Sequence, residues 1–226
     1  MIQELIAITL EIETIEKTLS IVELIKSGGF AGQLIIALLT FLLIVTLYIY
    51  FERLLTIKSA SKVDPNFMNE IKDYVVNGNF DAAKVLCMNV NSPVSRLIHK
   101  GVSRIGRPLA DINSSIENAG KLEVYSLEKN VSVLATISGA APMIGFLGTV
   151  IGMILSIFEI ANSGGQIYIK LLADGLYTAM TTTVGGLVVG IIAYISYNHI
   201  VGRTNKVVYQ MEANSVEFLD LLNEPT

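Results

Sequence analysis

Three long apolar runs dominate the hydrophobic pattern of the chain. They contain no Asp, Glu, Lys or Arg, and they cover residues 31–51, 131–158 and 175–201. A helix of about 20 apolar residues crosses the roughly 30 Å hydrocarbon core of a bilayer. The pattern therefore predicts an all-α integral membrane protein with transmembrane helices at residues 31–51, 133–160 and 172–199.

The three spans differ in the size of their residues. The first is rich in Leu, Ile, Phe and Tyr, which suits contact with lipid, whereas the other two are rich in Gly, Ala, Ser and Thr. Small residues let helix backbones approach closely. On the third helix they recur at every fourth position, at Thr178, Thr182, Gly186 and Gly190. The expected sites of close helix packing are Gly145, Gly148, Gly152, Gly186 and Gly190.

An amphipathic pattern precedes the first span. Apolar residues recur every three or four positions from Ile2 to Ile25, as one face of a helix requires, and the opposite face is acidic. Residues 1–30 are therefore predicted to form an outer amphipathic helix. Such a helix can lie in the membrane interface, but its acidic face weakens attraction to anionic lipid. Packing against a neighbouring subunit is therefore an equal alternative.

The segment after the first span carries helix start and stop signals. Asp64–Pro65 and Ser92–Pro93 each place an N-cap residue before a proline at the first helical position. Gly78 and Gly106 are expected to end the two helices.

Two further helices are expected to run on from the membrane spans. From Pro108 an apolar pattern continues without a helix breaker into the second span, which predicts one helix over residues 108–160. Such a helix would be on the order of 80 Å long. The third span is likewise expected to continue past Gly202. The second and third membrane helices would then both project far into the cytoplasm.

The distribution of Lys and Arg predicts the orientation in the membrane. Residues 52–130 hold eleven of the sixteen Lys and Arg residues, and such residues gather in cytoplasmic segments. We therefore expect a cytoplasmic helical segment at 52–132, a periplasmic loop at 161–171 and a cytoplasmic helical tail at 200–226. The N-terminus is then periplasmic.

Composition narrows the function further. Hydrophobic residues make up 52% of the 226 residues and charged residues 16%, against about 25% charged in a typical soluble domain. A net charge of −4 gives no reason to expect nucleic-acid binding. With one cysteine, Cys87, and two histidines 100 residues apart, no disulfide, metal site or nucleophile–base set can be assembled. We therefore expect neither an enzyme nor a cofactor.

The candidate functional residues lie inside the second and third spans. Pro142 removes a backbone donor and frees the carbonyl of Ser138, so it should kink the second helix. Intramembrane threonines commonly hydrogen-bond within or between helices, but several of them on small-residue faces favour a polar lumen. The predicted pore-lining residues are Thr149, Thr183, Thr182 and Thr178.

No charged residue lies in the body of any span. Glu159 and Asp174 occupy the outer ends of the second and third helices. A proton relay needs a titratable group within the membrane. If the chain conducts protons, a partner must therefore supply the acid.

These residues resemble the MotA/TolQ/ExbB proton channel family, and most of all its ExbB branch. The specific likeness lies in APMIGFLGTVIGMI, residues 141–154, and in GLYTAMTTTVGGLVVGIIAYISYN, residues 175–198. The order of segments along the whole chain also matches: a short outer N-terminus, one span, a cytoplasmic segment, two spans and a tail.

The resemblance implies a mechanism that the composition does not show. It implies a homo-oligomer, a pentamer of long helices, around a central pore in the bacterial inner membrane. A dimer of an ExbD-like single-span protein threads the pore and carries an intramembrane Asp. Proton flow turns or shifts this partner, which drives a TonB-like protein in outer-membrane transport. Thr149 and Thr183 match the pore threonines of the family.

One position departs from the family pattern. Many relatives have a glutamate in the third helix, in the stretch GIAEAL, where this chain reads GLYTAM and Thr178 replaces the acid. The channel therefore cannot use a glutamate there. A TolQ-like subunit for envelope integrity, a MotA-like stator and a non-conducting scaffold stay open as alternatives, as does the choice between H⁺ and Na⁺.

Overall fold

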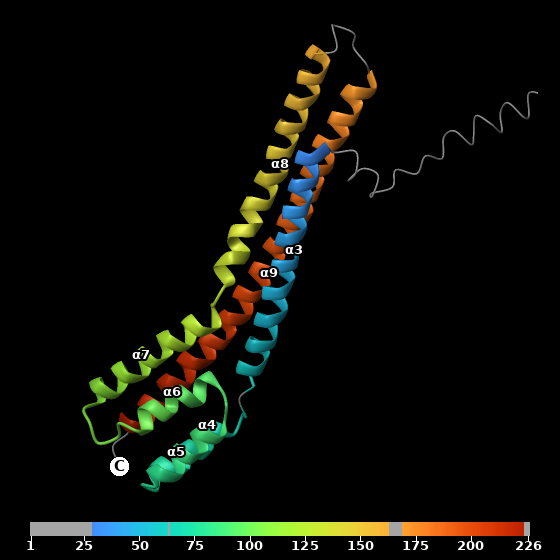
Figure 1. The fold of residues 1–226 in the computed structure, drawn as a ribbon. Coiled ribbons are helices and arrows are strands. Elements are labelled where there is room, and N and C mark those ends of the chain that lie inside the picture. Colours follow the sequence, from blue (N-terminus) through green and yellow to red (C-terminus); the bar gives the residue numbers. More distant parts are fainter. Residues whose placement is uncertain (1–28, 63, 163–168, 224–226) are drawn as a thin grey trace, which may run out of the picture. The chain divides into compact units, whose positions relative to one another are not determined.

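The computed structural model describes residues 29–62, 64–162 and 169–223, and these are folded into α-helices (Figure 1). The helices are α3 (Gly29–Ala60), α4 (Phe67–Val76), α5 (Phe80–Asn89), α6 (Pro93–Val102), α7 (Leu109–Leu127), α8 (Val131–Asn162) and α9 (Ile169–Asn223). No strand occurs in these ranges. The predicted outer helix, apart from its last two residues, and positions 163–168 of the predicted loop lie outside the described residues.

Three of these helices are long and apolar enough to cross a membrane. The candidate spans are Ala31–Ala60, Val131–Asn162 and Gly175–Asn223. The prediction of an all-α membrane protein with three transmembrane helices is thus confirmed. The third helix also continues without a break past Gly202 to Asn223, as predicted.

The prediction of one helix over residues 108–160 is wrong. α7 ends at Leu127 and α8 begins at Val131. Asn130, between them, has a φ of 62°, in the left-handed region that a short polar side chain tolerates better than an apolar one. The N–H of Val131 then donates to the carbonyl of Glu128 at 3.0 Å. Of the two helices that were expected to project far beyond the membrane, α9 therefore does so as one helix, whereas α8 begins at Val131.

A buried arginine on α3 holds the end of α7 at this break. Arg53 is 6% exposed, and its Nη1 donates to the carbonyl of Ser126 at 2.9 Å. The same guanidinium pairs with the carboxylate of Glu52. Because the last carbonyls of a helix lack helical partners, this contact stabilises a helix end that the apolar pattern of the sequence does not reveal.

The start signals of the short helices are only partly confirmed. Ser92 caps α6 in a capping box with Ser95, and Pro93 is its first residue, as predicted. α4 begins at Phe67, two residues after Pro65. The cause is local, because the Asp64 carboxylate accepts the N–H of Asn66 at 2.9 Å and forms a turn there.

The stop signals behave differently at the two glycines. Gly78 has a φ of +70° and follows α4 closely, as predicted. Gly106 has a φ of +93°, but α6 already ends at Val102 and turns connect the two. The sequence reasoning missed α5 altogether. Its signal is Asn79, whose side chain accepts the N–H of Ala82 as an N-cap.

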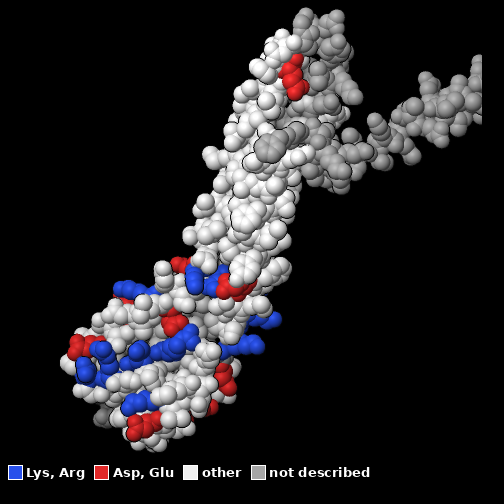
Figure 2. Space-filling view, viewed as in Figure 1, with Lys and Arg blue, Asp and Glu red and all other residues white. Residues whose placement is uncertain are grey.

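The described chain divides into two compact units. The first comprises residues up to Leu42 and Gly139–Gly190, and the second comprises Leu43–Ser138 with Ile191 onward. In the first, large apolar side chains such as Phe146 are exposed. Figure 2 shows that the visible face of this unit is almost free of charge, whereas Lys, Arg, Asp and Glu are interspersed over the second. The second unit has its own core, which includes Ile57, Ile71, Val94, Ile98, Leu97 and Phe218.

Candidate functional site

Within the first unit, α8 and α9 pack along a seam of small residues, which we call the α8–α9 seam. It consists of Ala141, Gly145, Gly148, Gly152 and Ser156 on α8 and of Gly175, Ala179, Thr182 and Gly186 on α9. The contacts run from Ala141 against Gly186 to Ser156 against Gly175. The two helices are therefore antiparallel along the seam.

The two backbones approach most closely where Gly145 faces Gly186. A Cβ on Gly145 would lie 2.8 Å from the carbonyl oxygen of Thr182 and 3.1 Å from the Cα of Gly186. A Cβ on Gly186 would lie 2.5 Å from the carbonyl oxygen of Ala141. Because these neighbours are backbone atoms, they cannot move aside as a flexible side chain can. Glycine is therefore required on both helices at this point.

The seam continues through two more glycines of α8. A Cβ on Gly148 would overlap the hydroxyl oxygen of Thr182, and a Cβ on Gly152 would lie 3.2 Å from the carbonyl oxygen of Gly175. The remaining predicted packing residue, Gly190, is buried four positions after Gly186. Pro142 lies inside α8 beside the start of the seam.

Thr149 and Thr183 meet across the seam. Their hydroxyl oxygens are hydrogen-bonded to each other. Thr149 also donates to the carbonyl of Ala179 at 3.2 Å, and Thr183 to the carbonyl of Gly145 at 3.2 Å. Each hydroxyl has one proton and can donate only one hydrogen bond at a time. The bond between the two hydroxyls therefore competes with their bonds to the backbone carbonyls. The structure thus brings together the two threonines that the family resemblance implied.

The other two predicted threonines are buried by helices of the same chain. Thr182 is fully buried against Gly148, and its hydroxyl donates to the carbonyl of Ala179 at 2.9 Å. Thr178 is buried, and its methyl group would lie 2.7 Å from a Cβ on Gly32 of α3. These contacts favour a packing role for Thr182 and Thr178, whereas Thr149 and Thr183 are only partly buried.

The sequence reasoning missed five packing residues, namely Ala141, Ala179, Ser156, Gly175 and Gly32. Ser156 and Gly175 face each other at the end of the seam, where the Ser156 hydroxyl donates to the carbonyl of Gly152 at 2.8 Å. Their signal was available, because Ser156 extends the spacing of four set by Gly148 and Gly152. Gly32, by contrast, belongs to no pattern, since its need for a small residue arises only from contact with α9.

The seam carries polar hydroxyls but no ionisable side chain. From residue 139 to 158 and from 175 to 190 the chain contains no Asp, Glu, Lys or Arg. Hydroxyl groups can solvate either form of a carboxyl group, because they both donate and accept hydrogen bonds. They cannot themselves bind and release a proton near neutral pH. A titratable group at this site would therefore have to come from outside the seam.

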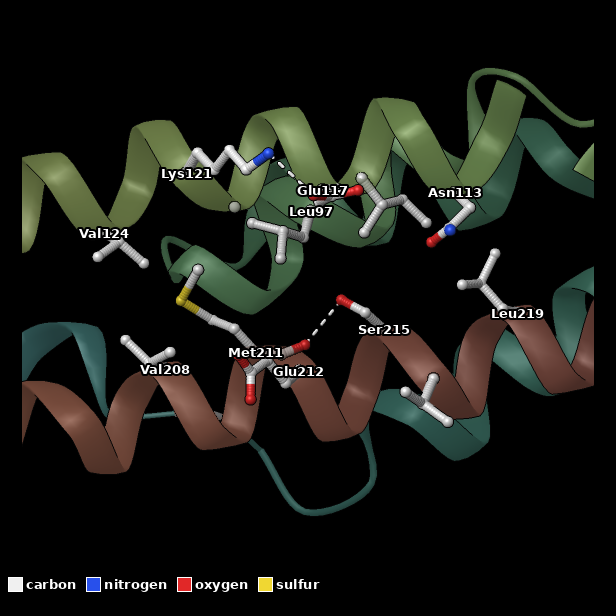
Figure 3. Close-up of a pocket in the computed structure, with 13 residues that line it drawn as sticks. Leu97, Asn113, Glu117, Lys121, Val124, Val208, Met211, Glu212, Ser215 and Leu219 are labelled. Carbon is white, nitrogen blue, oxygen red and sulfur yellow. Dashed lines mark hydrogen bonds and ion pairs between the residues drawn. The ribbon is translucent and has the colours of Figure 1, made fainter. Parts of the chain in front are cut away.

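A second feature is a groove of about 480 Å³ in the second unit, between α7 and α9 (Figure 3). Val208 and Met211 of α9 face Val124 of α7 across it. On its rim, Lys121 pairs with Glu117 at 2.8 Å and lowers the pKa of that carboxyl group. The groove is mainly apolar, and its polar lining residues include Asn113, Glu212 and Ser215.

Comparison with known proteins shows to which protein family this chain belongs. The model of the MotA/TolQ/ExbB proton channel family matches residues 89–213, more than half of the chain. The chain belongs to this family. The match includes α7, α8 and most of α9, and hence the whole α8–α9 seam.

Curated relatives within the MotA/TolQ/ExbB family point to its ExbB branch. An ExbB homolog of Methanothermobacter thermautotrophicus, described as a biopolymer transport protein, is 26% identical over 85% of this chain and 67% of its own length. The biopolymer transport protein ExbB of Aquifex aeolicus is 36% identical over 48% of the chain and 74% of its own length. The Tol-Pal system protein TolQ of Haemophilus influenzae is 35% identical over 38% of the chain and 37% of its own length.

Proposed function

We propose that this chain is the channel-forming stator subunit of an ion-driven motor in a bacterial inner membrane. The observation that carries the proposal is the hydrogen-bonded pair of Thr149 and Thr183 inside an uncharged seam of two membrane-spanning helices. A buried ionised carboxylate is costly unless donors surround it. Two partly buried hydroxyls supply such donors in an otherwise apolar environment.

The partner in this proposal is an ExbD-like single-span protein with an intramembrane Asp. The need for it follows from the composition of the seam, which has hydroxyl groups and no acid. Several copies of the chain, a pentamer in our proposal, surround this partner. The energy of the proton gradient then becomes mechanical work on a TonB-like protein for outer-membrane transport.

The proposed orientation places residues 52–132 and 200–226 in the cytoplasm. Residues 52–130 hold eleven of the sixteen Lys and Arg residues, which favours the cytoplasmic side. The N-terminus is then periplasmic and the C-terminus cytoplasmic.

Two observations favour other functions. Thr149 and Thr183 bond to each other and to backbone carbonyls, as they would in a scaffold whose threonines only hold helices together. The relative named as a Tol-Pal system protein favours a TolQ-like subunit, for which we expect a role in envelope integrity. Both alternatives make different predictions from an ExbB-like motor.

The deciding experiment reconstitutes the chain in liposomes with a single-span, acid-bearing protein encoded beside it. We expect proton flux with the wild-type partner, and none with a partner whose intramembrane Asp is changed to Asn. Equal flux from both would contradict the proposal. In cells, loss of the chain should abolish TonB-dependent uptake. Loss of detergent resistance with normal uptake would instead support the TolQ-like function.

A further inference from the structure

The groove between α7 and α9, which we call the α7–α9 groove, leaves apolar surface of the second unit uncovered. Its volume is about 480 Å³, and apolar side chains of α6, α7 and α9 line most of it (Figure 3). Val216 on its α9 side is 57% exposed. Exposed apolar surface with a polar rim marks an interaction site.

Two exposed apolar side chains lie on another side of α7. Leu122 is 73% exposed and Tyr125 is 78% exposed. They are three positions apart and are therefore neighbours on the helix surface. Because successive helical residues are turned by about 100°, they point away from Lys121 and Val124, which line the groove. α7 thus presents two different apolar surfaces, the α7–α9 groove and the pair of Leu122 and Tyr125, which we call the α7 ridge.

An unpaired charge lies beside each of these surfaces. Lys100 of α6 is exposed, lines a pocket together with Leu122, and pairs with no acid among the residues that the structure describes. Glu212 of α9 is exposed, lines the α7–α9 groove, and pairs with no Lys or Arg within the described ranges. On the opposite rim of the groove, Glu117 and Lys121 neutralise each other. The ridge is thus flanked by a positive charge and the groove by a negative one.

We propose that the α7 ridge of one copy of the chain docks into the α7–α9 groove of the next copy. This proposal rests on the homo-oligomer of the proposed function. A second copy fits better than another occupant, because one contact covers both apolar surfaces and pairs Lys100 of one copy with Glu212 of the next. Contact between two different surfaces is heterologous, so it passes from copy to copy and can close into a ring. The charge pair sets the direction in which the copies follow one another.

The first test is cross-linking in native membranes, in chains with Cys87 replaced by Ser. Two co-expressed chains, one with Leu122→Cys and one with Ser215→Cys, should be joined by a short bismaleimide, whereas neither chain alone should react with itself. Both substitutions in one chain should give a ladder of products that ends at the size of the ring. Val85→Cys with Ser215→Cys is the matched control, because Val85 is 56% exposed on α5 and lines neither surface. We expect no product from it.

The second test exchanges the two charges. Lys100→Glu and Glu212→Lys should each reduce the yield of the cross-link between copies, because like charges then meet across the contact. A chain with both substitutions should recover the yield, since opposite charges face each other again. Lys62→Glu, at an exposed position outside both surfaces, is the control and should leave the yield unchanged.

Three outcomes would overturn the docking of ridge into groove. Cross-linking of Leu122→Cys to itself would show that ridge meets ridge. Cross-linking of Ser215→Cys to the acid-bearing partner would show that the groove binds that protein instead. An intact oligomer in native mass spectrometry without the expected cross-link would place the contact elsewhere. None of these outcomes touches the proposed channel, which proton flux tests separately, whereas a monomeric wild-type protein would overturn the proposed homo-oligomer as well.

Discussion

Gly148 of α8 lies directly against Thr182 of α9, so that a Cβ on the glycine would overlap the threonine hydroxyl and lie 2.7 Å from its Cβ. Gly139 on the same helix has nothing within 4 Å of the equivalent position. We therefore expect Gly148→Ala to destabilise the protein by about 1–3 kcal/mol through overpacking. Gly139→Ala should be tolerated, and thermal unfolding in detergent measures the difference.

A second substitution shows whether this contact is the cause. Thr182→Gly removes both the hydroxyl and the Cβ that the new methyl group would meet, so it should recover part of the lost stability in the double variant. Gly148→Leu should also disturb oligomer assembly, which native mass spectrometry detects. Equal melting temperatures for Gly148→Ala and Gly139→Ala would mean that the seam can widen at no cost.

The proposed topology can be tested by cysteine labelling from each side of the membrane. In a variant with Cys87 replaced by Ser, Glu70→Cys should react only with a reagent that reaches the cytoplasm. Gln166→Cys should react with an impermeant reagent from the periplasm. Labelling of both positions from the periplasm would show that the excess of Lys and Arg in residues 52–130 does not set the orientation.

Cys87 itself should be almost unreactive in the folded protein. The thiol is 3% exposed, and burial raises its pKa to about 12. The thiolate is the reactive form, so a pKa raised by about three units leaves about a thousandfold less of it at pH 8. We expect slow alkylation in native membranes and rapid alkylation in SDS. Rapid reaction at pH 8 without denaturant would show that α5 opens readily.

The salt bridge between α6 and α7 should contribute to the stability of the second unit. Arg96 binds both carboxylate oxygens of Glu123, with its Nε at 2.6 Å and its Nη2 at 2.7 Å, and this raises the pKa of the guanidinium. Because the pair is partly exposed, a double-mutant cycle with Arg96→Met and Glu123→Gln should give a coupling energy of about 0.5–1 kcal/mol. Arg96→Lys should lose part of it, since lysine cannot bind both oxygens. The exposed pair of Lys121 and Glu117 is the control, for which we expect no measurable coupling.

The membrane helices could be predicted from the sequence because their signal is local. An uncharged run long enough to cross a bilayer has few alternatives, and small residues spaced by four mark the face that packs. The break at Asn130 could not be predicted, because asparagine also occurs inside helices. What stabilises the break is tertiary, a guanidinium from α3 bonded to the carbonyl of Ser126. The missed helix α5 is a different case, because Asn79 gave a cap signal in the sequence.

The candidate pore threonines could likewise be predicted only in part from the sequence. Sequence and resemblance together selected four residues, and the structure pairs Thr149 with Thr183. Sequence periodicity alone cannot separate these from Thr182, because it does not say which neighbour covers a given face. Thr182 is buried because Gly148 lacks a side chain at the position that its hydroxyl occupies. That relationship depends on the register between α8 and α9.

The pore hypothesis is tested most directly at Thr149 and Thr183. Replacing either by Val keeps the shape of the side chain and removes the hydroxyl, so the donors for a partner's carboxylate are lost. We expect loss of motor-dependent uptake, with normal protein level and oligomer size. Thr181→Val is the control, because the Thr181 hydroxyl bonds to the carbonyl of Tyr177 on its own helix at 2.8 Å. Thr178→Val should be milder than either, since Thr178 is buried against α3. If both Thr149→Val and Thr183→Val support wild-type uptake, the two hydroxyls only hold α8 and α9 together, and the ion path runs elsewhere.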